Sequence, residues 1–210
     1  MKIFPLLSIL FVATSAFAAD SLPEPWKQQD VGTAETPGTA STDGSAFTLQ
    51  GTMDIWGPAD GCHIVWQPFH GDGEIIARVT SVENTAGHAK GSICIRESLD
   101  AGARHATMAV TPADGTQFLS REQKDGKSTS QITGQDKGRM PCWVKIIRKG
   151  NEFSGYESGD GENWTPVGKI SLDIGQDVVA GICSSSHVKD KLCKVTIDHV
   201  KVSSETKSAK

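Results

Sequence analysis

The densest group of residues able to do chemistry lies in residues 91–110, GSICIRESLDAGARHATMAV. Two apolar runs flank a polar group made of Arg96, Glu97, Asp100, Arg104 and His105. Such a group is typical of a reaction centre, a ligand-binding edge or a salt-bridged turn. The guanidinium of Arg96 could bind a sugar hydroxyl or a carboxylate in a forked geometry, although such an arginine is more often tied to a neighbouring acid or to loop carbonyls. Arg96 and Glu97 are adjacent in an expected strand, so their side chains point to opposite faces.

No complete catalytic signature occurs in the chain. Glycosidases need two carboxylates at a defined separation, whereas the glutamates here are scattered and lie mostly at expected turns. The G-x-S-x-G elbow of serine hydrolases is absent, and spacing singles out no cysteine–histidine pair. We therefore predict no catalytic residue, and keep a divergent glycan-processing enzyme that uses Glu97 or another acid as the alternative.

Metal-binding spacing is also missing. The six histidines show neither H-x-x-x-H nor H-E-x-x-H spacing, and no CxxC occurs. The glycine-rich turns HGDGE and SGDGEN offer carboxylates that would suit Ca²⁺ loosely, and SGDGENW also resembles an Asp-box hairpin, in which Asp caps the turn and Trp fills the core. We favour the hairpin and expect no cofactor, with Ca²⁺ as the open alternative.

Aromatic and polar side chains supply the remaining candidates. Tryptophan faces stack on sugar rings, and Gln, Arg and His add directional hydrogen bonds, although any single tryptophan is also ordinary core material. The expected ligand-binding residues are Trp66, Gln67, Arg96, Glu97, His105, Gln117, Arg121, Trp143 and Tyr156.

Short strand-like runs must position these residues. Eleven runs alternate with turn signals such as HGDG, PADG and KDGK, in which Gly after Asp accepts the backbone conformation that tight hairpins need. No stretch has convincing helical periodicity. We therefore predict an all-β sandwich of about a dozen strands in two antiparallel sheets. The runs are residues 47–56, 63–69, 74–82, 91–96, 106–112, 116–122, 143–149, 152–158, 164–172, 177–184 and 194–202.

The period of two assigns faces within these runs. Ala106, Met108 and Val110 should share one face, with His105, Thr107 and Ala109 on the other. Residues 117, 119 and 121 should likewise share a face. One sheet is then expected to carry a polar and aromatic outer surface over an apolar inner one, which is typical of a solvated face and also of a sugar-binding face.

The ends of the chain predict its compartment and domain limits. Residues 1–18 have a cation, Lys2, a short apolar run and a small-residue cleavage pattern, so we predict a signal peptide and a secreted or periplasmic protein. We expect an irregular lead-in at 19–45, the sandwich at 46–202 and a polar tail at 203–210. No further segment is long enough to span a membrane, and a net charge of −4 gives no electrostatic reason to bind nucleic acid.

Five cysteines in an oxidising compartment are expected to pair and leave one over. Cys183 and Cys193 flank a predicted hairpin centred near Val188, which would make them the best disulfide pair. Cys62 with Cys94 is a weaker alternative, and all five could instead be buried thiols.

Two stretches carry a family resemblance. Residues 51–112, from GTMDIWGPADGC to HATMAVTP, and the later PCWVKIIRKGNEFSGYESGDGENWTPVG resemble bacterial secreted domains of the concanavalin A-like lectin/glucanase type, including the family linked to regulation of enolase. The resemblance covers roughly residues 24–202 and implies a jelly-roll sandwich of two curved sheets and an accessory role beside carbohydrate-active enzymes. The E-x-D-x-x-E pattern of laminarinase-like members is absent. Cys62, Cys94 and Cys142 stand where the family tends to show aromatic or aliphatic residues.

These observations together predict a secreted, non-catalytic β-sandwich that binds a carbohydrate. Its alternatives are the divergent enzyme and a structural or protein-interaction module. A fold alone does not decide among them, so the site must.

Overall fold

The computed structural model describes residues 22–132 and 139–205, and all regular structure in these ranges is β-strand. The predicted signal peptide lies outside the described residues. Across the described parts of the chain, no helix is long and apolar enough to cross a membrane.

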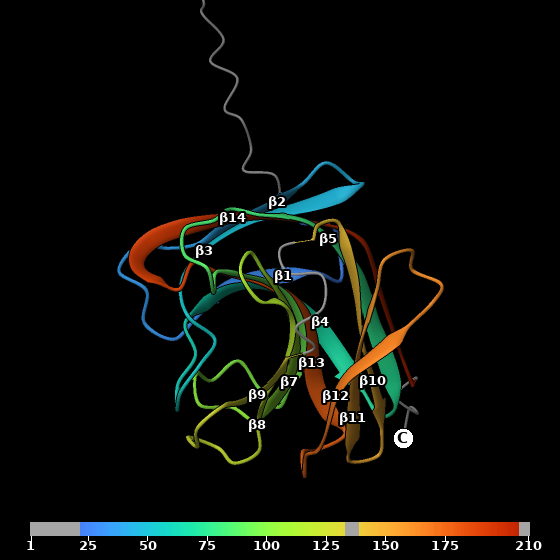
Figure 1. The fold of residues 1–210 in the computed structure, drawn as a ribbon. Helices are drawn as coiled ribbons and strands as arrows, with labels where there is room; N and C mark the ends of the chain where they lie inside the picture. The colour runs from blue at the N-terminus through green and yellow to red at the C-terminus, as the bar shows by residue number, and fades with distance from the viewer. Residues whose placement is uncertain (1–21, 133–138, 206–210) are drawn as a thin grey trace, which may run out of the picture.

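Fourteen strands form two seven-stranded antiparallel sheets. Their arrangement can be followed in Figure 1. In spatial order, sheet A contains β1 (Lys27–Val31), β4 (Cys62–His70), β13 (Asp177–Ser185), β6 (Lys90–Arg96), β7 (His105–Thr111), β8 (Gly115–Arg121) and β9 (Thr129–Ile132). Sheet B contains β12 (Thr165–Ser171), β11 (Glu152–Ser158), β10 (Cys142–Lys149), β5 (Gly73–Val82), β14 (Val188–Ser204), β3 (Ala46–Met53) and β2 (Thr39–Thr42). The predicted all-β sandwich is confirmed.

The main core fills the space between the sheets, because alternate residues of each strand point inward. Ala106, Met108 and Val110 of β7 lie in this core with Val144 and Ile146 of β10. The face assignment made for β7 from its period of two is therefore correct. Where β3 packs against β13, a Cβ on Gly51 would lie 2.1 Å from the Ser184 carbonyl oxygen, so this approach requires glycine.

All eleven predicted runs are strands, but the sequence pattern missed β1, β2 and β9. Each of the three lies at an edge of its sheet. An edge strand pairs with one neighbour, and β9 is exposed along its whole length, so no buried alternation marks it in the sequence. The lead-in at 19–45 is consequently less irregular than predicted, since it contains both β1 and β2. The polar tail also begins later, because β14 continues through Ser204.

The predicted disulfides are not formed. Cys62, Cys94, Cys183 and Cys193 are all free thiols. The Cys183–Cys193 prediction assumed a hairpin, but β13 belongs to sheet A and β14 to sheet B, so the two thiols lie in different layers. Cys62 and Cys94 lie on β4 and β6, which are separated by β13.

Candidate functional site

A second, smaller hydrophobic cluster lies on the outer face of sheet A, where the loops 54–61 and 97–104 cover the strands. It contains Ile64, Cys94 and Leu119 from the strands and Ile55 from the first loop. This part of the outer face is therefore interior, and only the remainder of the face can meet a ligand.

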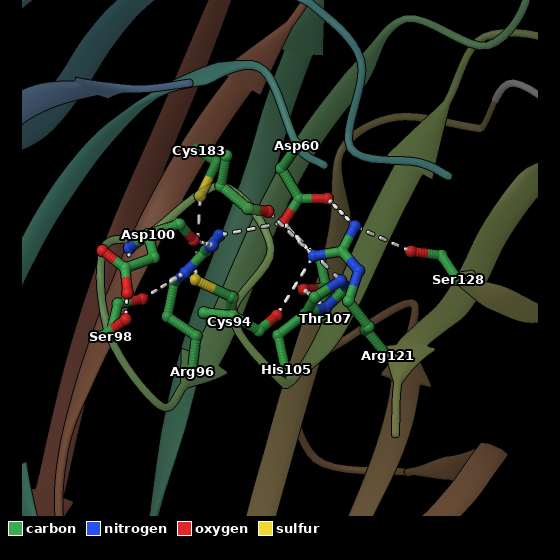
Figure 2. Close-up of polar contacts among 12 residues, drawn as sticks. Asp60, Cys94, Arg96, Ser98, Asp100, His105, Thr107, Arg121, Ser128 and Cys183 are labelled. Atoms are coloured by element: carbon green, nitrogen blue, oxygen red, sulfur yellow. Dashed lines mark hydrogen bonds and ion pairs between the residues drawn. The ribbon is translucent and has the colours of Figure 1, made fainter. Parts of the chain in front are cut away.

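A buried ionic network anchors these loops to the sheet (Figure 2). The Asp60 carboxylate accepts two hydrogen bonds from Arg121, at 2.6 and 3.0 Å, and its Oδ2 lies 3.3 Å from Nη1 of Arg96. Arg96 also donates to the carbonyls of Ser98 and Asp100, both at 2.7 Å. Because each guanidinium bonds several carbonyls as well as one carboxylate, its donors are consumed within the chain.

Arg121 connects the network to three loops. It donates to the carbonyl oxygens of Gly57 and Gly126 and to those of Ala101 and Ala103. Breaking such a buried pair leaves an uncompensated charge, which typically costs about 3–5 kcal/mol. The network therefore has a structural role in this conformation.

His105 completes the network as a neutral group. Its Nδ1 lies 2.9 Å from the Thr107 hydroxyl, and its Nε2 lies 3.7 Å from Asp60. Burial lowers the pKa of His105 to about 3, with the Arg96 and Arg121 charges acting in the same direction and Asp60 opposing them. The imidazole is consequently uncharged at neutral pH.

These positions correct part of the predicted ligand set. Arg96, His105 and Arg121 are at most 1% exposed, so they cannot touch a ligand in this conformation. Loops 54–61 and 97–104 cover them, and a sequence pattern assigns residues to a sheet face without showing what covers that face. Glu97, half-buried, instead forms an ion pair with Arg104 at 2.5 Å, which lowers its pKa.

The predicted aromatic residues lie on other surfaces. Trp66, on the outer face of sheet A, carries Lys27 over its ring at 5.5 Å, and alternation places Gln67 on the opposite face. Trp143 and Tyr156 lie on sheet B, where Arg78 and Lys145 cover their rings at 5.6 and 5.3 Å. The predicted residues therefore do not form one site.

The turn SGDGEN joins β11 to β12 in the predicted way. Asp160 Oδ1 accepts hydrogen bonds from the backbone of Glu162 and Asn163, at 2.9 and 2.8 Å. The hydrogen bond from the Asn163 side chain, followed by these backbone bonds, lowers the pKa of Asp160. Trp164 does not fill the core as expected, because it lies on the outside of sheet B. There the Lys145 ammonium nitrogen is 4.0 Å from the centroid of its ring.

The open part of the outer face of sheet A contains a pocket of about 300 Å³, within the size range of small-ligand sites. Only Gln117 among the predicted ligand residues lines it. Four connections at one end of the sandwich and three strands, β6, β8 and β9, supply the walls, which are Asp54, Trp56, His88, Lys90, Asp114, Gln117, Ser130, Ile132 and His187.

Polar groups in this pocket are organised by hydrogen bonds. His187 Nδ1 lies 2.8 Å from Asp54, and His88 Nδ1 lies 2.8 Å from Asp114. The ammonium of Lys90, whose side chain is 4% exposed, bonds Asp54 and the His88 carbonyl. Carboxylate, imidazole, ammonium and amide groups thus converge on one small volume.

Apolar contact surface is present at the same place. Among the described residues, the large hydrophobic side chains that remain exposed are Trp56, at 46%, and Ile132, at 50%, and both line this pocket. An exposed indole beside fixed polar groups offers both a stacking surface and directional hydrogen bonds.

Backbone conformation fixes two of the connections. Met53 and His187 have positive φ angles of 65° and 57°, which are uncommon for residues other than glycine. The His187 amide donates to the Met53 carbonyl at 2.7 Å, so the connection after β3 and the β13–β14 turn are held together. Such conformations cost about 1–3 kcal/mol each and cluster at functional sites.

Sequence reasoning missed most of this pocket. Asp54 and Trp56 occur in the run DIWG, where a tryptophan immediately before a glycine–proline turn could have indicated an exposed ring. His88, Asp114 and His187 lie far apart in the chain and have no motif spacing, so only the topology brings them together.

Comparison with known proteins supports the fold class. The sequence matches no family model and none of the curated proteins with which it was compared. The structure is similar to a Saccharomyces cerevisiae protein of unknown function, with 15% identity, a TM-score of 0.63, and coverage of 86% of this chain and 97% of that one.

Two further structures have carbohydrate-related titles. The Bacillus subtilis carbohydrate binding module CBM66 has 18% identity, a TM-score of 0.54, and coverage of 85% of this chain and 95% of that one. A Bacillus licheniformis β-glucanase has 12% identity, a TM-score of 0.54, and coverage of 86% and 92%. The chain therefore has a concanavalin A-like jelly-roll fold, whereas the narrower resemblance to the regulation-of-enolase family has no matching family model.

Proposed function

We propose that this protein binds a carbohydrate, without cleaving it, in the pocket lined by Trp56, Ile132, Lys90 and the two histidine–aspartate pairs. The observation that carries the proposal is the coincidence of exposed apolar side chains and converging polar groups at one small pocket. A sugar has an apolar C–H face and a ring of hydroxyls, so it needs both kinds of contact.

The contacts can be assigned by chemistry. The Trp56 indole would stack on the sugar face, and Ile132 would extend the apolar contact. Lys90 and the Gln117 amide would donate to hydroxyl oxygens, while Asp54 and Asp114 would accept from hydroxyl groups. Gln117 already donates to Asp114 at 3.2 Å, so its orientation is set before a ligand arrives.

The fold shared with a carbohydrate binding module and a β-glucanase is compatible with either binding or hydrolysis. We favour binding because each carboxylate of the pocket is already paired, Asp54 with Lys90 and His187 and Asp114 with His88. A glycosidase instead needs two carboxyl groups that face the scissile bond, whereas both carboxylates of this pocket are engaged by side chains of the protein itself.

A glycan array followed by calorimetric titration tests the proposal. Trp56→Ala should weaken binding at least tenfold, about 1.4 kcal/mol, whereas the matched control Trp164→Ala on sheet B should bind as the unmodified protein does. If Trp164→Ala abolished sugar binding and Trp56→Ala did not, the binding site would lie on the aromatic surface of sheet B. Absence of binding by the folded protein would remove the proposal, and release of new reducing ends would favour the enzyme alternative.

We also propose export from the cytoplasm, which the apolar run and small-residue pattern in residues 1–18 support. Amino-terminal sequencing of the protein from cell fractions tests it. A chain that begins at residue 19 or 20 in an extracytoplasmic fraction is expected, and a chain retaining Met1 in the cytoplasm would contradict export.

A further inference from the structure

Two imidazoles lie against each other in the pocket. The ring centroids of His88 and His187 are 5.2 Å apart, and the ring planes are tilted by 60°. The rings come from the β5–β6 connection and the β13–β14 turn, so the topology and not the local sequence places them together.

Both rings use the same nitrogen to bond a carboxylate. Nδ1 of His88 lies 2.8 Å from Asp114 Oδ2, and Nδ1 of His187 lies 2.8 Å from Asp54 Oδ2. Within the described residues, neither Nε2 atom has a hydrogen-bond partner, and the side chains of His88 and His187 are 52% and 40% exposed. Each imidazole thus has its second nitrogen available to a solute.

A carboxylate on one nitrogen is how metal-binding histidines are usually oriented, because it fixes the tautomer and makes the other nitrogen a better donor. With Zn–N bonds of about 2.0–2.1 Å and ring nitrogens about 1.2 Å from each centroid, two imidazoles on a tetrahedral zinc ion have centroids about 5.2 Å apart. The observed separation agrees with that value.

We propose that His88 and His187 bind one zinc-type divalent metal ion through their Nε2 atoms. The surrounding charges favour a cation, because the carboxylates of Asp54 and Asp114 outnumber the single ammonium of Lys90. The inference goes beyond carbohydrate binding, since it requires no sugar.

The site has open coordination positions. Among residues 22–132 and 139–205, no group of three or more His, Cys, Asp and Glu side chains is arranged to hold a metal ion. Two protein ligands, one fewer than in catalytic zinc sites, leave the remaining positions to water or to an exogenous oxygen ligand. The metal is therefore exchangeable and does not support the fold.

Isothermal titration of the mature protein with zinc chloride, without sugar at pH 7.5, tests the proposal. One zinc ion per chain is expected. His88→Gln and His187→Gln should each weaken binding at least tenfold, and the positioning variant Asp114→Asn about tenfold. The matched control is His70→Gln, because His70 also has Nδ1 2.8 Å from a carboxylate, that of Asp177, but lies outside the pocket.

Circular dichroism of each variant shows whether the fold is retained, and magnesium chloride serves as the comparison ion because Mg²⁺ prefers oxygen ligands. Zinc binding that is lost in the pocket variants and retained in His70→Gln, with no comparable Mg²⁺ binding, supports the site. Absence of saturable zinc binding by the folded protein, or undiminished binding after replacement of both pocket histidines, would overturn it.

Discussion

The buried histidine of the Asp60 network should make the stability of this protein depend on pH in a way that one substitution removes. His105 has a folded-state pKa of about 3, lowered chiefly by burial, against an ordinary value of 6.5. Between about pH 3 and pH 6.5 the unfolded chain binds a proton at this position that the folded chain does not. The free energy of unfolding therefore rises with pH across that window, and the contribution of His105 is lost progressively as the pH falls below 6.5.

The size of the effect follows from these values. At pH 5.0 the unfolded histidine is protonated and the folded one is not. Protonation therefore lowers the free energy of unfolding by about 1.5 pH units at 1.36 kcal/mol each, or about 2 kcal/mol. At pH 7.5 this decrease in the free energy of unfolding is close to zero. Because His105 is fully buried, solvent does not screen this contribution appreciably.

Urea unfolding at pH 7.5 and pH 5.0 measures the effect, with His105→Gln as the comparison. Other groups titrate in both proteins, so the difference between their pH dependences isolates His105. From pH 7.5 to pH 5.0, the free energy of unfolding of the original protein should fall by about 2 kcal/mol more than that of the variant. The NMR signals of the imidazole should also remain those of the neutral ring at pH 5.0. Parallel pH dependences, or a ring that titrates near pH 6.5 in the folded protein, would refute the reasoning.

Three further predictions concern packing and the network. Arg121→Met should lower the free energy of unfolding, measured in urea, by about 3–5 kcal/mol, because the buried Asp60 carboxylate loses the guanidinium that donates two hydrogen bonds to it. A decrease below about 1 kcal/mol would mean that other contacts hold the loops. Gly155→Ala should cost about 1–3 kcal/mol in thermal unfolding, since its Cβ would lie 2.3 Å from the Phe118 ring, and Phe118→Leu in the same chain should recover part of the loss; an unchanged melting temperature would contradict this contact. Hydrogen bonds with the Cys62 and Cys94 thiols and burial raise the pKa of Cys183, so its alkylation, followed by mass spectrometry, should proceed only while the structure is open, and fast alkylation of the native protein would show that the loops open readily.

Strand prediction succeeded for every strand with neighbours on both sides, and for the edge strand β12, whose partly buried Val167 and Ile170 pack against the core. β7 alternates Ala106, Met108 and Val110 with residues of the opposite face, and this pattern is visible in the sequence because the inner face must be apolar. β9 lacks such a face, since all four of its residues are exposed. Its backbone bonds to β8 stabilise it, and backbone bonding leaves no pattern of side chains.

Arg96 and Arg121 illustrate the limit on predicting a site. Their positions on one face of sheet A were predictable, but their burial depends on Asp60, a single carboxylate in a loop 36 residues or more away in the sequence. A polar residue on a strand has the same local pattern whether water, a ligand or a loop lies above it. The interpretation as ligand-binding residues was wrong for this reason.

The sequence by itself determined the all-β class, the approximate strands, the inner and outer faces and the Asp160 turn, because these depend on neighbours within a few residues and on the need to bury apolar side chains. Only the tertiary structure decided which part of the outer face is covered, that the Cys94 and Cys183 sulfurs lie 3.7 Å apart, and that His88, His187, Asp54 and Asp114 share a pocket. Those contacts join connections that are distant in the chain and adjacent only at one end of the sandwich. Local periodicity carries no information about such adjacency, whereas the pairing order of the strands fixes it.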